Sequence, residues 1–138
     1  MGEVIVMVIL FDRFHLPDDV LDIVFATKQQ KIVAAELIKF ISEHGGTIGK
    51  TEMSYFATKL HDGDYEAFLD EEPYKGKKVK LSYNKRQFYD RILTPMKTMG
   101  LVDYDMYKKT YNISDKFHTE MLRIGLMWKE RVGKILKR

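Results

Sequence analysis

Residues 92–114, with the sequence ILTPMKTMGLVDYDMYKKTYNIS, hold the pattern that decides the fold. Ile92, Met96 and Met99 recur at helical spacing, which predicts the last turns of a helix. Gly100 follows them, and glycine readily takes the left-handed conformation that turns a chain out of a helix. Alternating apolar and polar residues then predict two short strands, residues 101–105 and 109–113, joined by a loop at 106–108. The stretch therefore predicts a helix followed directly by a β-hairpin.

Two further helices are predicted earlier in the chain. Thr27 with Gln30 three residues later is a capping-box pattern, which predicts a helix at 28–44. The Gly-Gly pair that follows is predicted to end this helix. Thr51 is predicted to cap a second helix, which ends near His61. The apolar faces of these two helices consist of Val33, Leu37, Phe40, Ile41 and His44 in the first and Met53, Phe56, Ala57 and Leu60 in the second.

The third helix, which leads into residues 92–114, is expected to open at Ser82 or Asn84, because either side chain can cap a helix. Pro95 either kinks this helix or starts a new turn after Thr94, since proline has no N–H to donate. The face turned towards the core is predicted to consist of Phe88, Ile92, Met96 and Met99.

A long connection, residues 62–81, separates the second and third helices. It is acidic before Pro73 and rich in lysine after it, and connections of this length are unusual inside a compact domain. It is expected to be an insertion loop, or else to place residues 79–81 as a strand beside the hairpin. One short helix carrying Tyr65, Phe68 and Leu69 is possible in its acidic part.

Both ends of the chain extend beyond this core. Residues 1–27 are expected to pack on it, with a strand or short core helix at 4–11 and a helical turn that Asp18 caps. The apolar run 4–11 is far shorter than the roughly 20 residues that span a bilayer. At the other end, Ser114 is predicted to cap a long helix over 116–138. Its apolar stripe consists of Phe117, Met121, Ile124, Trp128, Val132 and Ile135.

Three helices followed at once by a hairpin resemble the winged helix-turn-helix family over residues 28–115. The residues that carry the resemblance are Met96, Met99, Gly100, Leu101 and Val102 at the helix end and Tyr111, Ile113 and Ser114 on the returning strand. The resemblance implies an α+β fold that is mostly α, with the third helix in the major groove of DNA and the hairpin, or wing, on the backbone or minor groove. The chain departs from the family at 62–81, where a short turn is usual.

Charge is distributed unevenly along the chain. Of its 138 residues, 1–72 hold 6 Lys/Arg against 14 Asp/Glu, a net charge of −8, whereas 73–138 hold 17 against 6, a net charge of +11. Residues 75–97 are the densest basic region, with eight Lys/Arg and one acidic residue, Asp90. Such asymmetry indicates a polyanionic partner for one end of the molecule. We therefore expect double-stranded DNA as the partner.

The expected DNA contacts follow from side-chain chemistry. Arg86 suits guanine, Gln87 suits adenine and lysines suit phosphate, whether on the third helix or at the wing. The full expected set is Lys77, Lys78, Lys80, Asn84, Lys85, Arg86, Gln87, Tyr89, Lys97, Lys108 and Lys109.

Other classes of function have weaker signals. The chain contains no cysteine, which excludes disulfides and thiolate zinc sites and favours a cytoplasmic protein. His61, Asp62 and Asp64 form one conceivable metal-binding group, but its spacing is not diagnostic and a polar turn after a helix explains it better. A second such group consists of Asp12, His15, Asp18 and Asp19. No phosphate-binding loop or nucleophile elbow occurs, so we expect no enzyme, cofactor, metal or small-molecule ligand.

The last helix is longer than a small domain needs, so part of its stripe is expected to meet a second subunit. The expected dimer interface consists of Met121, Ile124, Trp128 and Val132. Together these features predict a dimeric winged-helix regulator of transcription. The alternative is a winged helix that binds protein within a transcription, replication or viral assembly.

Overall fold

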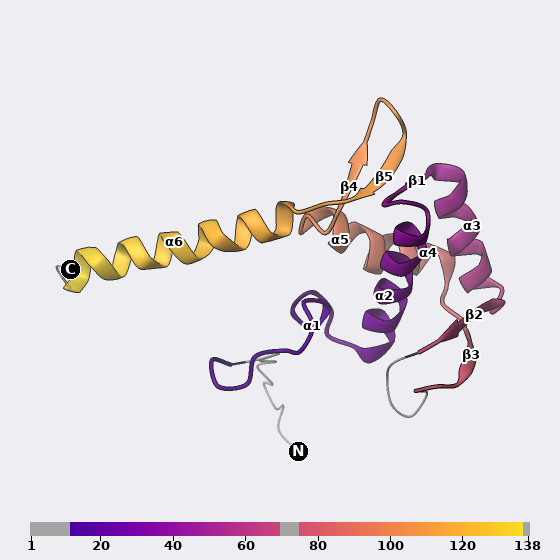
Figure 1. The fold of residues 1–138 in the computed structure, drawn as a ribbon, viewed down its shortest axis with the longest axis horizontal. Coiled ribbons are helices and arrows are strands. Elements are labelled where there is room, and N and C mark those ends of the chain that lie inside the picture. The colour runs from indigo at the N-terminus through magenta and orange to yellow at the C-terminus, as the bar shows by residue number, and fades with distance from the viewer. Residues whose placement is uncertain (1–11, 70–74, 137–138) are drawn as a thin grey trace, which may run out of the picture.

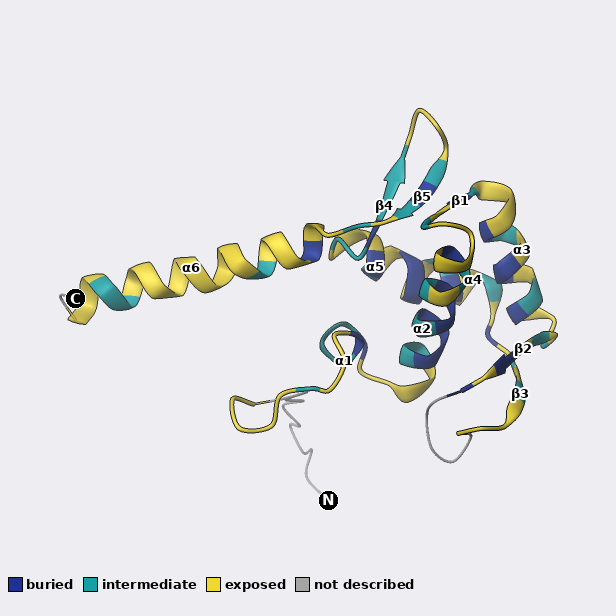
Figure 2. Ribbon diagram, in the orientation of Figure 1, coloured by how far each residue is buried: buried dark blue, intermediate teal, exposed yellow. Residues whose placement is uncertain are grey.

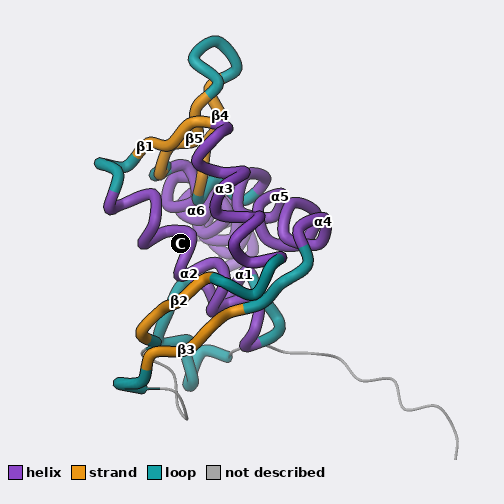
Figure 3. Tube along the Cα trace, turned by 90° about the vertical axis from the view of Figure 1, so that its right-hand side faces the viewer, coloured by secondary structure: helices purple, strands orange, loops and turns teal. Residues whose placement is uncertain are grey.

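The computed structural model describes residues 12–69 and 75–136 as an α+β fold, mostly helical, with a small antiparallel sheet (Figure 1). Three helical stretches form the body, a three-stranded sheet lies at one end of it, a two-stranded sheet lies at the other, and one long helix extends outward (Figures 1 and 3). The body helices are α2 (Lys28–Glu43), α3 (Lys50–His61) and a third helix made of α4 (Lys85–Phe88), η1 (Tyr89–Leu93) and α5 (Thr94–Thr98).

The first body helix, α2, begins and ends as predicted. Thr27 Oγ1 accepts a hydrogen bond from the backbone N–H of Gln30 at 3.1 Å, which caps the helix start. At the other end Gly45 and Gly46 have φ values of 79° and 93°, and the Gly46 N–H donates to the carbonyl of Ile41 at 2.9 Å. This left-handed pair satisfies the last carbonyls of the helix and turns the chain away.

The start of α3 differs from the prediction, because the helix begins at Lys50 with Gly49, not Thr51, in the capping position. The Gly49 N–H donates to the side-chain carboxylate of Glu52. The residues before it form a strand that was not predicted, β1 (Thr47–Gly49), in which Ile48 is buried opposite Tyr111. Three residues are too few to show a strand period.

The third helix is continuous, but it changes register in the middle. Asn84 Oδ1 accepts from the Gln87 N–H at 3.0 Å, which confirms Asn84 as the cap. The segment η1 is a π-helical turn, closed by the Thr94 N–H donating to the Tyr89 carbonyl, and α5 follows with Pro95 in its first turn. A wider turn just before a proline accommodates the ring and the missing donor. Met99, predicted to face the core, lies past this shift and is exposed, while Leu93 is buried.

The three-stranded sheet has the order β1-β5-β4, and all its pairs are antiparallel. Strand β4 (Val102–Asp105) and strand β5 (Thr110–Ile113) form the predicted hairpin, with a turn at 106–109. The turn is one residue longer than predicted, because Lys109 has a φ of 55° and belongs to it. Val102 and Tyr111 face the core, whereas Ile113 is exposed.

Residues 79–81 lie in a strand, as one of the two expectations had it, but this strand is not beside β4 and β5. Strand β2 (Tyr65–Phe68) pairs antiparallel with β3 (Lys78–Leu81), and the two form a sheet of their own. Ala67 and Leu69 are buried beneath this hairpin, which gives it a small apolar cluster with Ile32 of α2. The predicted short helix is therefore wrong, because Tyr65 and Ala67 turn inward at the two-residue period of a strand.

The β2–β3 hairpin leaves the body and returns to it at almost the same point. The Tyr83 N–H donates to the carbonyl of Leu60 at 2.9 Å, and the Lys85 N–H donates to Nδ1 of His61 at 3.1 Å. The end of α3 and the start of α4 are thus bonded directly. The insertion does not separate α3 from the third helix.

One hydrophobic core joins the three body helices to the sheet (Figure 2). Phe56 of α3 lies at its centre, fully buried, with its ring centroid 5.3 Å from Phe40, 4.9 Å from Tyr65 and 5.5 Å from Phe88. The core therefore reaches from α2 through α3 to the third helix. It fixes the third helix in place and leaves its far side exposed.

The two ends of the described chain are placed differently. The short helix α1 (Leu21–Val24) packs on the core through Leu21 and Phe25, and Asp19, not Asp18, accepts from the Leu21 N–H. The strand or short core helix predicted at 4–11 lies outside the described residues. The long helix α6 (Lys116–Leu136) is buried only at Phe117 and projects from the body (Figures 1 and 2). No helix within 12–69 and 75–136 has the length and apolar character that crossing a bilayer requires.

Gly100, the residue that turns the chain from α5 into β4, has two reasons to be glycine. Its φ is 83°, and an added Cβ would lie 2.8 Å from the backbone nitrogen of Phe117 and 2.9 Å from the Lys116 Cβ. We expect Gly100→Ala to lower the free energy of unfolding by about 2–3 kcal/mol, combining strain with a forced shift of α6. Chemical denaturation measures this change. Gly45→Ala is the matched control, because Gly45 has a φ of 79° with nothing within 4 Å, so an equal loss would rule out the steric part.

Candidate nucleic-acid interface

The exposed face of the third helix carries cations without acidic partners. Arg91 and Lys97 are exposed, and in the part of the chain that the structure describes neither side chain has a carboxylate within ion-pair distance. Arg86 is exposed as well, with its Nε 3.9 Å from Asp90 Oδ2, a loose pair that a stronger anion can displace. Gln87 lies exposed one residue further along. This helix face thus presents guanidinium, ammonium and amide groups to solvent.

Two residues of the expected DNA-contacting set instead hold the helix in place. The side-chain oxygen of Asn84 is used by the helix cap. Lys85 is half-buried, and its Nζ donates to Thr58 Oγ1 at 2.9 Å and to Ser54 Oγ at 3.3 Å, both on α3. Asn84 therefore caps its own helix, and Lys85 joins α4 to α3. Helical periodicity placed Lys85 at the flank but could not show that α3 lies there.

Tyr89 belongs to a junction between α3, the third helix and the hairpin β4–β5. Its ring packs edge-on against Phe88 with centroids 5.4 Å apart, its hydroxyl is hydrogen-bonded with Ser54, and burial raises its pKa above the usual range. Tyr104 and Tyr111 stack 4.7 Å apart on the neighbouring strands. Tyr89 is therefore held by packing, with only part of the ring free to contact a ligand.

Lys50 lies at the same junction and was not among the residues expected from the sequence. Its Nζ is 5.5 Å from the centre of the Tyr104 ring, which is a cation–π contact, and its side chain is exposed. Lys50 is the first residue of α3, and its charge lies against the hairpin β4–β5. Lys50 belongs to the acidic half of the chain, so the distribution of charge along the sequence did not indicate it.

The turn at 106–109 presents two further lysines on an ordered tip. One carboxylate oxygen of Asp105 accepts from the backbone N–H groups of Tyr107 at 2.9 Å and Lys108 at 3.0 Å. Lys108 and Lys109 are exposed, and Tyr107 is 99% exposed. The backbone hydrogen bond from Lys108, followed by that from Tyr107, holds the pKa of Asp105 below its ordinary value of 3.8.

We expect acid to loosen this turn before it unfolds the body. A carboxylate with a lowered folded-state pKa adds stability above its unfolded-state pKa and loses it as pH falls through the folded-state value. NMR titration of the Asp105 side chain should therefore give a midpoint below 3.8, with the Tyr107 and Lys108 amide signals moving at the same midpoint. A midpoint for Asp105 at or above 3.8 would contradict the turn.

The second hairpin carries the remaining lysines of the expected set. Lys77, Lys78 and Lys80 are exposed along or just before β3. Lys78 Nζ lies 2.7 Å from Glu66 Oε2, and this contact lowers the pKa of Glu66. Glu66 also stands opposite Lys80 across the strand pair. One of these lysines is therefore partly neutralised, and this hairpin is a weaker anion site than the third helix.

The acidic and basic halves of the sequence are only partly separated in the folded structure. Asp62 and Asp64 follow α3, whose end is bonded to the start of α4, so two carboxylates lie near Lys85. On the hairpin β4–β5, Asp103 binds Lys116 at 2.6 Å, and Asp105 is used by its turn. Among the described residues of the third helix and this hairpin, the exposed cations that form no ion pair are Arg91, Lys97, Lys108 and Lys109.

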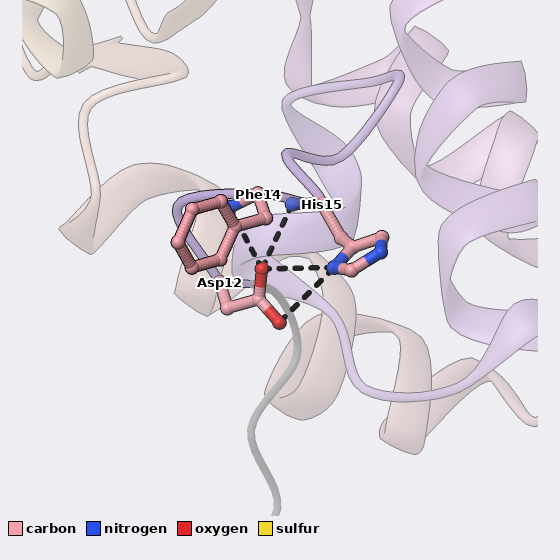
Figure 4. Close-up of polar contacts among 3 residues, drawn as sticks. All are labelled: Asp12, Phe14 and His15. Carbon is pink, nitrogen blue, oxygen red and sulfur yellow. Dashed lines mark hydrogen bonds and ion pairs between the residues drawn. The ribbon is translucent and has the colours of Figure 1, made fainter.

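Neither conceivable metal-binding group is assembled. Asp12 closes a tight turn, in which its Oδ1 accepts from the Phe14 and His15 N–H groups at 2.8 Å each and lies 3.0 Å from His15 Nδ1 (Figure 4). The ring nitrogen Nδ1 of His61 accepts from the Lys85 N–H and is not free to bind a metal. Among the described residues, no three His, Asp or Glu side chains gather closely enough to hold an ion.

Comparisons of this chain with protein-family models, curated proteins and solved structures find no match. The candidate interface is therefore described from the positions and contacts of its own residues. Sequence reasoning left Lys50 and Arg91 out of the set of contacts. Arg91 lies in the densest basic stretch, so the charge pattern could have indicated it. The period of an ideal helix does not give the direction of its side chain correctly, because Arg91 lies in the π-helical turn.

Proposed function

We propose that residues 28–115 form a winged helix-turn-helix that binds duplex DNA and that the protein regulates transcription. In this proposal α3 and the third helix are the helix-turn-helix, and β4, β5 and their turn are the wing. The third helix enters the major groove, and the wing contacts the adjacent backbone or minor groove.

The order of elements supports the winged-helix assignment. After α2 come a short strand, α3, the third helix and a hairpin, and the sheet has the order β1-β5-β4. The hairpin follows the third helix directly in the chain, which supports its assignment as the wing. The β2–β3 hairpin separates α3 from the third helix in the sequence. The hydrogen bond between the Tyr83 N–H and the Leu60 carbonyl nevertheless joins the end of α3 to the segment that leads into the third helix.

The observation that carries the DNA-binding proposal is the run of cations over two adjacent elements. Arg91 and Lys97 on the third helix and Lys108 and Lys109 on the wing are exposed, and none of them forms an ion pair among the described residues. Lys50 adds a further exposed cation against the wing, over the Tyr104 ring. Phosphate contacts of this kind supply affinity and orientation, while Arg86 and Gln87 are suited to base edges.

Selection on random-sequence duplex DNA tests this proposal most broadly. We expect the purified protein to enrich a defined motif, with Arg86→Ala and Gln87→Ala relaxing the preference at individual positions by about 1–3 kcal/mol per base pair. Enrichment of no sequence, together with no retention of any duplex, would contradict it.

A second candidate function has one observation in its favour. The wing tip carries Met106 and Tyr107, both strongly exposed, next to the lysines. Exposed apolar and aromatic side chains favour a protein partner, as in winged helices that serve as interaction modules. This alternative predicts no salt-dependent binding to duplex DNA, and the selection experiment therefore separates the two.

A further inference from the structure

We propose that α6 pairs with α6 of a second copy of this chain in an antiparallel two-helix arrangement. The starting observation is an apolar face without a partner. Ile124, Trp128 and Ile135 are 52%, 63% and 66% exposed, although they lie on one side of a helix that projects from the body (Figure 2). A stripe of large apolar side chains at this exposure marks an interaction site.

The spacing of the stripe is that of a helix-pairing seam. Phe117, Met121, Ile124, Trp128 and Ile135 recur at intervals of three, four or seven residues, with Arg131 in the remaining position. Such a repeat keeps one seam facing a partner helix along its length. Phe117 is buried in its own body, so the open part of the seam begins at Met121.

Charge decides the direction of the pair. In a parallel pair each seam residue meets its own copy, so Arg131 would face Arg131 and Trp128 would face Trp128. In an antiparallel pair Ile124 faces Trp128 of the second copy, and Arg131 lies over Met121, where its aliphatic stem can pack. The antiparallel direction removes the like-charge contact from the seam.

The residues that flank the seam agree with this direction. Glu120 lies opposite Lys134 of the second copy, once at each end of the pair. Among the described residues of one chain, Glu120 pairs with Arg123 at 3.1 Å and Lys134 with Glu130 at 3.4 Å, both exposed neighbours on the same helix. Such exposed pairs contribute little, so they can exchange for contacts across the seam.

Gly125 gives an independent reason to expect a close partner. A glycine inside a helix destabilises it relative to alanine, and nothing in the single chain lies within 4 Å of a Cβ added there. In the antiparallel pair Gly125 faces Gly125 of the second copy at the centre. A missing side chain at that point lets the two helices approach. The winged bodies would then lie at opposite ends of a pair about 27 Å long, from 1.5 Å of rise per residue.

Sedimentation of the full chain tests the pairing. We expect a dimer at micromolar concentration that Ile124→Glu converts to a monomer. Leu126→Glu is the matched control, because Leu126 is 60% exposed on the opposite side of the same helix, and this variant should stay dimeric. A monomeric wild type, or a dimer that Ile124→Glu does not weaken, would overturn the proposal.

Single cysteines test the direction, since the chain has none of its own. Met127→Cys should form a disulfide between copies under mild oxidation, because residue 127 lies near the centre of the antiparallel pair. Met121→Cys should not, because the two copies of residue 121 would be about 15 Å apart along the axis. Cross-linking at 121 and not at 127 would show a parallel pair and overturn the proposed direction. These readouts do not depend on DNA binding.

Discussion

Replacing Arg91 and Lys97 together by alanine is expected to weaken binding to duplex DNA roughly 30-fold at physiological salt. Each phosphate that a cation neutralises contributes about 0.9 to the slope of log affinity against log salt concentration, so two lost contacts lower its magnitude by about 2. Both side chains are exposed and unpaired among the described residues, so the fold should not suffer. Fluorescence anisotropy with labelled duplex measures both quantities.

The matched control for this variant removes two lysines from other surfaces. Lys39 lies exposed on α2 and Lys129 on α6, and both are outside the proposed interface. Lys39→Ala with Lys129→Ala changes the net charge by the same amount, so it should weaken binding only through the general field, by about threefold or less. Equal losses in the two double variants would mean that affinity follows net charge and not the third helix.

Replacing Phe56 by alanine is expected to lower the free energy of unfolding by about 3–5 kcal/mol. The Phe56 side chain is fully buried, and its ring contacts Phe40, Tyr65 and Phe88. Its removal would leave a cavity between α2, α3, the third helix and the β2–β3 hairpin. Urea denaturation followed by circular dichroism measures the change, which is a large share of the stability of a domain of this size.

Tyr55→Ala is the comparison for this loss, because Tyr55 is the preceding residue of α3 and is 56% exposed. It should cost about 1 kcal/mol or less. If the two substitutions cost the same, Phe56 would not lie at the centre of the core.

Local rules predicted the elements whose ends are decided by neighbouring residues. Thr27 caps α2, and Gly100 ends the third helix before a hairpin, as the sequence indicated. In both cases the deciding hydrogen bond or φ value lies within a few residues of the position itself. The exposed positions of Arg86, Lys97 and the wing lysines follow from the same periodicity.

The elements that depend on distant partners were not predicted, apart from a strand at 79–81 that was expected beside the other hairpin. Strand β1 exists because Ile48 pairs with Tyr111, more than sixty residues later. The β2–β3 hairpin depends on a cross-strand register, Glu66 against Lys80, and on burial of Ala67 against α2. Lys85 was expected at DNA but donates to Ser54 and Thr58, which only the packing of α3 brings near. These are tertiary effects that override local pattern.

The salt dependence of duplex binding tests the central claim most directly. With about five phosphates neutralised, the affinity of the unmodified protein should fall with a log–log slope of roughly −4 to −5 as salt concentration rises. The titration requires only the purified chain and a labelled random duplex. A slope near zero, or no binding at low salt, would contradict the proposal that this protein acts on DNA.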